Sequence, residues 1–133
     1  MSKPIHQEVV INAEPRQVYE VLTSAERFSQ MSGGAPTEMQ PEAGGAFSNF
    51  GGMIVGRNIE LVPGQRVVQV WRAKTWAEGV YSVARFELKA QGKETKVVFD
   101  HSSFPEGQGE HLAAGWEANY WTPMRAYFAA SKT

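Results

Sequence analysis

The chain contains no cysteine among its 133 residues. This absence excludes disulfide bonds, thiolate metal ligands and cysteine nucleophiles. The sequence also lacks any apolar run near the roughly 18 residues that a membrane-spanning helix needs. Its first residues, Met-Ser-Lys-Pro-Ile-His, have no apolar segment of the kind found in a secretory signal peptide. We therefore expect a cytoplasmic protein that does not insert into a membrane.

An excess of charge of either sign is missing as well. The 13 Lys and Arg residues and 14 Asp and Glu residues give a formal net charge of −1. This charge gives no electrostatic reason to expect nucleic acid or an anionic membrane as a partner. Hydrophobic residues make up 42% of the chain and charged residues 20%, a globular balance. No linker, repeat or low-complexity segment is present, so residues 1–133 are expected to form one domain.

Most of the chain carries the pattern of β-strands. Alternation and β-branched residues predict a first strand at Ile5–Asn12, followed by a helix with Pro15 near its first turn and a short helix over Ala25–Met31. Six further strands are predicted at Thr37–Gln40, Ala46–Phe50, Ile54–Val62, Arg66–Ala73, Tyr81–Ala90 and Thr95–His101. The turns between them are short, which favours antiparallel neighbours, because parallel strands need crossovers of about a dozen residues.

The last quarter of the chain has the strongest single pattern, which predicts a helix over Glu110–Ala130. Its apolar face is formed by Leu112, Ala113, Trp116, Tyr120, Met124, Tyr127 and Phe128. A face this broad needs an apolar cover, and the strands are the only candidate. The element order β-αα-β6-α therefore predicts an α+β fold, a curved antiparallel sheet wrapped around a long C-terminal helix. Pro123 predicts a kink near Asn119–Thr122.

Several stretches of the sequence, taken together, are similar to a known family. These stretches are Gly44–Phe47, Gly56–Gly64, Val70–Gly79, Gly115-Trp116 and Tyr120-Trp121. On them the chain resembles the START-like helix-grip superfamily, also called SRPBCC. More narrowly, it resembles the C-terminal domain type of the heat-shock protein 90 ATPase activator family. The resemblance runs from Ile5 to Phe128 and implies a helix-grip fold.

The resemblance also implies two kinds of activity. Co-chaperone members stimulate a partner chaperone's ATPase, whereas pockets under the long helix bind hydrophobic molecules in the wider superfamily, where a minority are enzymes. Our leading hypothesis is a non-enzymatic domain, without a cofactor, that binds a hydrophobic small molecule or a protein partner. The alternatives are a co-chaperone-like regulator and a small enzyme using Glu117 and His101. A void of several hundred cubic ångströms between helix and sheet would favour a ligand, and a close-packed interface would favour a protein partner.

The polar motifs of the sequence do not form a recognisable catalytic or metal site. Asp100 and His101 are neighbours on a strand, point to opposite faces and cannot form the carboxylate–imidazole pair of a triad. We expect His101 instead to be a strand-end residue that its neighbours hydrogen-bond. His101, His111 and Glu110 match no metal-ligand spacing, and we expect ordinary solvated histidines. The glycines at 44–56 lack a following Gly-Lys-Ser/Thr, so they are assigned to turns and bulges.

Glu117 falls within the apolar arc of the predicted helix, so we expect its carboxylate at the helix–sheet interface. A buried carboxylate needs a partner, and Arg57, Arg72 and Arg85 lie on predicted strands. Glu117 would form a structural salt bridge that fixes the helix on the sheet, be a rim residue that reaches solvent, or, with an arginine, form the polar end of a ligand pocket. The pocket candidates are Arg57, Trp71, Arg72, Arg85, Phe86, His101, Leu112, Trp116, Glu117, Tyr120 and Met124.

Trp76 lies in the segment Lys74–Gly79, which the sequence predicts as a hairpin tip. A tryptophan exposed there would favour a contact surface for a protein partner. The alternative is a tip that folds back onto the sheet and buries the indole.

Overall fold

The computed structural model describes residues 3–130. Its strands are β1 (Ile5–Ile11), β2 (Glu38–Met39), β3 (Ala46–Asn49), β4 (Ile54–Val62), β5 (Arg66–Ala73), β6 (Ser82–Gln91) and β7 (Glu94–Ser102). Its helices are α1 (Pro15–Thr23), α2 (Ala25–Met31), α3 (Gly109–Trp116) and α4 (Thr122–Ala130), with a 3₁₀ turn η1 (Phe50–Gly52) and a π-helical turn η2 (Glu117–Trp121). Within this part of the chain, no helix is long and apolar enough to cross a membrane.

The strands form one antiparallel sheet in the order β1-β7-β6-β5-β4-β3-β2. The predicted fold is confirmed, and the bounds of β4 and β5 are those predicted. The other predicted strands differ from the observed ones by one residue at one end or at both ends. The shortest strand, β2, lies between Pro36 and Pro41, which cannot donate to a β ladder.

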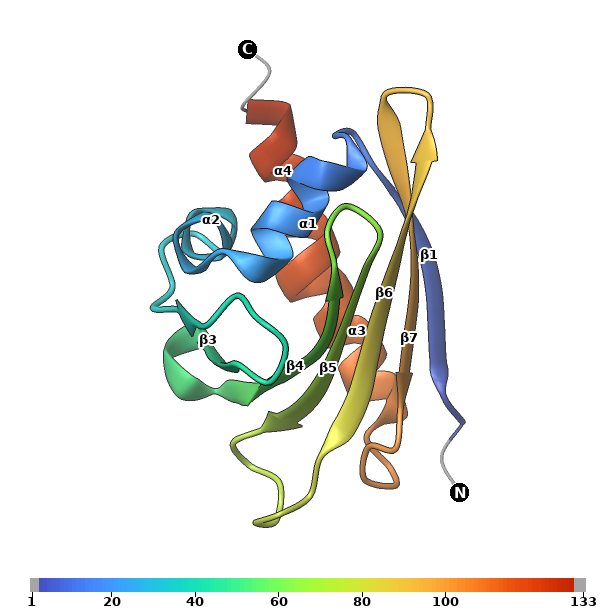
Figure 1. Ribbon diagram of the computed structural model, residues 1–133. Helices are drawn as coiled ribbons and strands as arrows, with labels where there is room; N and C mark the ends of the chain where they lie inside the picture. The colour runs from blue at the N-terminus through green and yellow to red at the C-terminus, as the bar shows by residue number, and fades with distance from the viewer. Residues whose placement is uncertain (1–2, 131–133) are drawn as a thin grey trace.

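The C-terminal helical segment α3–η2–α4 lies across one face of the curved sheet (Figure 1). Alternate residues of the central strands point toward it, and Phe86 on β6 and Phe99 on β7 are completely buried there. Helix α1 covers part of the same face against β5, β6 and β7, and α2 contacts α4. The hydrophobic core is therefore the space between the sheet and these helices.

The helix irregularity expected from Pro123 takes the form of the π-helical turn η2. Residues spaced every four positions drift by about 40° per step in a regular α-helix, or about 160° from Leu112 to Phe128. A π turn, in which Thr122 N–H bonds to Glu117 C=O, holds an extra residue and removes part of this drift. As a result Leu112, Trp116 and Phe128 are all buried, although the regular spacing would separate them.

Candidate functional site

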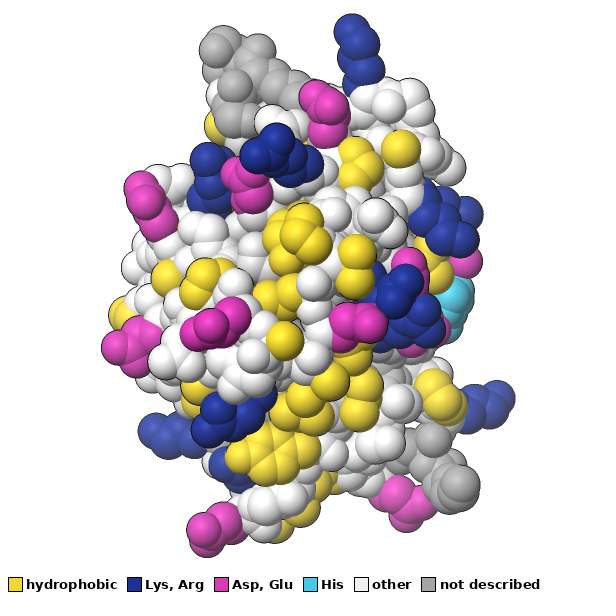
Figure 2. Space-filling view, viewed as in Figure 1, with side chains coloured by type: hydrophobic (Ala, Val, Ile, Leu, Met, Phe, Trp, Pro, Cys, Tyr) yellow, Lys and Arg dark blue, Asp and Glu magenta, His cyan; other side chains and the backbone are white. Residues whose placement is uncertain are grey.

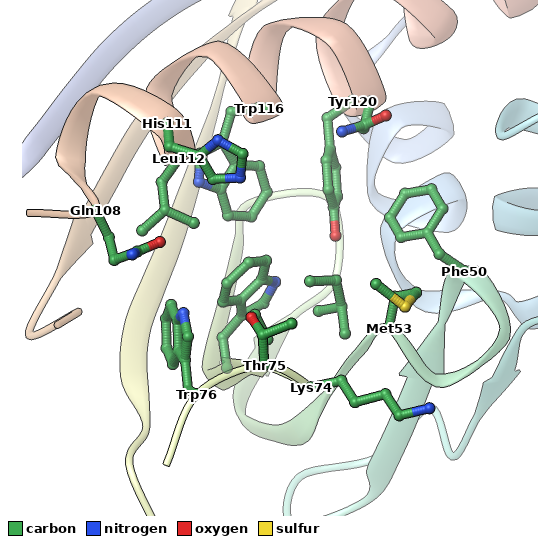
Figure 3. A pocket seen from close by; sticks show the side chains of 15 residues that line it. Phe50, Met53, Lys74, Thr75, Trp76, Gln108, His111, Leu112, Trp116 and Tyr120 are labelled. Atoms are coloured by element: carbon green, nitrogen blue, oxygen red, sulfur yellow. The ribbon is translucent and has the colours of Figure 1, made fainter.

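A pocket of about 410 Å³ opens where α3 passes the loop between β5 and β6. Figure 3 shows side chains from the helix, from this loop and from η1 lining one space. The lining residues are Phe50, Met53, Ile54, Trp71, Ala73, Lys74, Thr75, Trp76, Gln108, His111, Leu112, Gly115, Trp116, Asn119 and Tyr120. The helix–sheet interface is therefore open at this end, and the volume lies within the usual range of small-molecule sites.

Three tryptophans form one part of the apolar wall. The ring of Trp71 on β5 lies 5.6 Å from that of Trp76 and 5.3 Å from that of Trp116, centroid to centroid. Trp76 is only 8% exposed, so of the two alternatives for the hairpin tip the one that folds back onto the sheet is observed, and Trp76 is not an exposed contact residue. At these separations the three rings pack directly against one another and form one continuous apolar wall.

Arg72 fixes the loop that carries Trp76 and does not itself line the pocket. Its guanidinium donates to the backbone carbonyls of Trp76, at 2.7 Å, and Ala77, at 3.2 Å. It also lies over the Tyr81 ring, with 5.8 Å between Cζ and the ring centroid. The predicted pairing of Arg72 with a buried Glu117 is therefore wrong, because Arg72 Nη2 donates to backbone carbonyls and Glu117 pairs with Arg125.

Phe50 lines the opposite side of the pocket from a left-handed backbone conformation, with φ of 54°. Such a conformation costs on the order of 1 kcal/mol for a residue with a side chain. Edge-to-face contacts hold its ring against Phe28 at 5.4 Å and Tyr120 at 5.8 Å. The left-handed backbone conformation and these ring contacts together hold the Phe50 ring at the pocket wall.

Tyr120 brings a polar group to the deep end of the pocket. Its hydroxyl accepts a hydrogen bond from Asn49 Nδ2 at 3.4 Å. Burial raises the pKa of Tyr120 to about 12, against the smaller lowering effects of the Trp71 and Asn49 side chains. The phenol is consequently a neutral donor at physiological pH. The Trp71 indole N–H, buried nearby, makes no directed hydrogen bond within the described residues.

His101 is completely buried behind this wall, so the expectation of a solvated histidine is wrong. Its Nδ1 accepts the Trp116 indole N–H at 2.9 Å, so the proton of the neutral ring lies on Nε2. That N–H donates to Ser82 Oγ at 2.6 Å, and Ser82 in turn donates to the Trp71 carbonyl at 2.9 Å. Burial lowers the pKa of His101 to about 4. Both ring nitrogens are occupied, which leaves neither for a metal ion or a substrate.

Glu117 is exposed on the helix surface, and the prediction of a buried carboxylate is wrong. Its side chain accepts hydrogen bonds from Thr122 Oγ1 and Arg125 Nη1, each at 3.0 Å. The buried face near Glu117 is set by Leu112 and Trp116, and Glu117 lies about 100° from Trp116 around the helix axis. The prediction treated residues 110–130 as one regular α-helix. It therefore placed Glu117 by the apolar positions of α4 as well as those of α3, although the π turn shifts the two relative to each other. Neither Glu117 nor His101 lines the pocket, which removes the enzyme hypothesis built on that pair.

The remaining pocket candidates divide by position. Trp71, Leu112, Trp116 and Tyr120 line the pocket, whereas Phe86 and Met124 are buried elsewhere in the core. Arg57 donates to the Gly44 carbonyl at 3.0 Å, and Arg85 pairs with Glu87, both away from the pocket. Asp100 points outward and bonds to His6 at 2.7 Å, as its strand position requires. Together with Glu8, this contact raises the pKa of His6.

Sequence reasoning missed most of the pocket mouth. Met53, Lys74 and Thr75 come from turns, and His111 and Asn119 are exposed residues on the helix. Turn residues and polar helix positions carry no periodic signal that would place them beside one another. The one available signal was Gly115, an unexplained glycine inside a strong helical pattern.

The family described as "Activator of Hsp90 ATPase homolog 1-like protein" matches residues 12–129 of the chain. The chain belongs to this family. The human activator of 90 kDa heat shock protein ATPase homolog 1 is 27% identical over 114 residues, which cover 86% of this chain and 33% of that protein. The Dictyostelium discoideum homologue is 30% identical over 118 residues, covering 88% and 30%. The chain thus spans about a third of the length of these curated relatives.

Solved structures agree on the fold. An Hsp90 activator from Plasmodium falciparum superposes with a TM-score of 0.89 at 23% identity, covering 96% of this chain and 97% of that one. The Aha1 dimer from Colwellia psychrerythraea gives a TM-score of 0.77 at 18% identity, covering 95% and 96%. At these identities the structural likeness shows the fold alone, which is the helix-grip architecture.

Proposed function

We propose that this domain binds a small, planar and largely apolar molecule in the pocket beside α3 and does not act as an enzyme. The pocket volume of about 410 Å³ suits such a ligand. Its walls are mainly aromatic and aliphatic, and a few polar groups lie at the mouth and at the deep end. The two residues considered for catalysis point elsewhere.

Gly115 is the observation that carries this proposal. A glycine inside a helix costs about 1 kcal/mol relative to alanine. A Cβ placed at Gly115 would meet only Asn119 Nδ2, at 3.8 Å, an ordinary contact distance. Packing therefore does not require a glycine here. Because Gly115 lines the pocket, a side chain at this position would instead take up pocket volume.

The test is a fluorescence titration with the neutral apolar probe N-phenyl-1-naphthylamine. We expect the wild-type protein to bind the probe and Gly115→Leu to lose binding at least tenfold. The same substitution should raise the free energy of unfolding by up to about 1 kcal/mol, because leucine has the higher helix propensity.

The matched control is Ala114→Leu, which adds a leucine to the exposed side of the same helix and should keep probe binding. Absence of binding to the wild type would contradict the proposal. So would equal binding by wild type and Gly115→Leu.

A second candidate function is regulation of an Hsp90-type chaperone, and family membership supports it. The buried Trp76 is unsuited to partner contact, but apolar side chains gather on the outer face of the sheet (Figure 2). Tyr81, 48% exposed, borders a shallow hollow there with Val55, Val70 and Arg57.

An ATPase assay of an Hsp90-type chaperone, with and without this protein, tests the second candidate. Stimulation that Tyr81→Ala weakens and Gly115→Leu leaves intact would support regulation through the outer face. If the protein neither stimulates the ATPase nor forms a complex with the chaperone, this candidate is wrong.

A further inference from the structure

The charge of the pocket lining is one-sided, whereas its neutral polar residues Thr75, Gln108 and Asn119 can both donate and accept hydrogen bonds. Among the lining residues, Lys74 and His111 are basic and none is acidic. The Lys74 side chain is exposed and runs along the rim beside Met53 (Figure 3). It forms no ion pair with any acidic side chain in the range 3–130. The nearest elements therefore leave a positive charge at the mouth uncompensated.

The deep end of the pocket holds polar groups without partners. The Tyr120 oxygen accepts the Asn49 amide N–H. The Trp71 indole N–H, on a side chain only 4% exposed, lies near the same oxygen but outside hydrogen-bond geometry, and Asn49 Oδ1 is also unpaired among residues 3–130. A guest that supplies an acceptor oxygen would satisfy the Trp71 N–H.

The first turn of α3 adds to this field at the mouth. Gln108 and His111, at the start of the helix, line the pocket, and the Gln108 side chain makes no capping hydrogen bond. The start of a helix carries a partial positive charge that favours anions. Glu110 lies in the same turn but is exposed and not part of the lining.

We propose that the ligand of this pocket is an amphipathic anion, with a flat apolar body among Trp71, Trp76 and Trp116 and an acidic group at the mouth beside Lys74. The inference rests on the proposed function and specifies the class of ligand. The acidic group belongs at the mouth because a carboxylate or sulfonate buried away from water is costly. At the rim it stays hydrated while Lys74 neutralises it.

A matched pair of probes isolates the acidic group. The anion 8-anilinonaphthalene-1-sulfonate and the neutral N-phenyl-1-naphthylamine share the same naphthalene and phenyl groups and differ by the sulfonate. We expect Lys74→Gln to weaken binding of the sulfonate about fivefold, the upper range for an exposed ion pair. Binding of the neutral probe should stay unchanged. Raising the salt from about 20 to about 500 mM should weaken the sulfonate selectively, because salt screens exposed charges.

Lys93→Gln is the control for general charge, since Lys93 is exposed in the turn between β6 and β7, outside the pocket lining. It should leave both affinities unchanged. The inference is overturned if Lys74→Gln leaves sulfonate binding intact, or weakens both probes by the same factor. In either case the proposed function survives, because the neutral probe still binds the wild type. Failure of the proposed function would give a different result. In that case neither probe would bind the wild type, or Gly115→Leu would leave the binding of both probes unchanged.

Discussion

Along the C-terminal helix, α3 borders an open pocket whereas α4 lies against a filled core. On the α3 side the facing elements are a loop and the 3₁₀ turn η1, and the helix contributes Gly115 and Asn119. On the α4 side the helix contributes the buried Met124 and Phe128, and α2 packs alongside. A loop covers a helix less evenly than another helix does, and small residues leave the gap unfilled. The pocket therefore follows from local cover and side-chain volume, while the sheet is the same for both halves.

The two halves of the helix also show that an open and a close-packed helix–sheet interface are not alternatives. We expected either an open or a close-packed helix–sheet interface, and the protein has one at each end. The pocket and the outer face of the sheet are separate surfaces. Ligand binding and partner binding are consequently independent hypotheses that separate variants can test.

The largest expected effect is a difference in stability between two tryptophan-to-alanine variants, one in the closed core and one at the open pocket. Trp121, 1% exposed, donates to Gln7 Oε1 at 2.7 Å and packs in the closed part of the core. Trp121→Ala should lower the free energy of unfolding by about 4 kcal/mol, since it leaves a cavity and an unpaired group. Trp76→Ala should cost about 1–2 kcal/mol, because its space joins an existing pocket open to water. Urea unfolding measures both, and equal losses would contradict the division into open and closed halves.

A second prediction concerns His101, which joins the pocket wall to the closed core through Trp116. Its pKa is about 4 in the folded protein and near 6.5 when unfolded, so the unfolded chain binds the proton more readily. Stability should therefore fall as the pH drops from about 6.5 to about 4, by about 3 kcal/mol. Unfolding at several pH values measures this slope. In His101→Gln the slope should be lost, and an unchanged profile would show that other groups cause it.

The smallest expected effect is at Glu117, on the surface between the two halves. Its ion pair with Arg125 is exposed, so Glu117→Gln should change the free energy of unfolding by no more than about 0.5 kcal/mol. Thermal or urea unfolding checks this value. A loss of several kcal/mol would return Glu117 to the interior, where the helical wheel had placed it.

The fold was largely predictable, and the site only in part. Strand bounds came within one residue because alternation and turn residues are local signals. Trp71, Leu112, Trp116 and Tyr120 were found because large apolar side chains on inward faces are both core and pocket wall. Glu117 was misplaced because the π turn changes the helix phase, and Pro123 marks an irregularity there without showing how far the phase shifts. Gly115 stood out as a glycine inside a helical pattern. Its role as a pocket residue became clear only from the loop and the turn η1 that face it across the pocket.

The sequence by itself determined the element order, the antiparallel sheet and the apolar face of the long helix. Those features depend on the period of neighbouring side chains, which any stretch of the chain displays. Only the tertiary structure decided that Trp76 folds inward, that His101 is buried and neutral, and that Lys74 stands at a pocket mouth. Each of these facts depends on contacts between strands, turns and the helix that lie far apart in the chain. The space around a side chain and the polarity of its surroundings depend on all the segments that pack together, so no single segment of the sequence determines them.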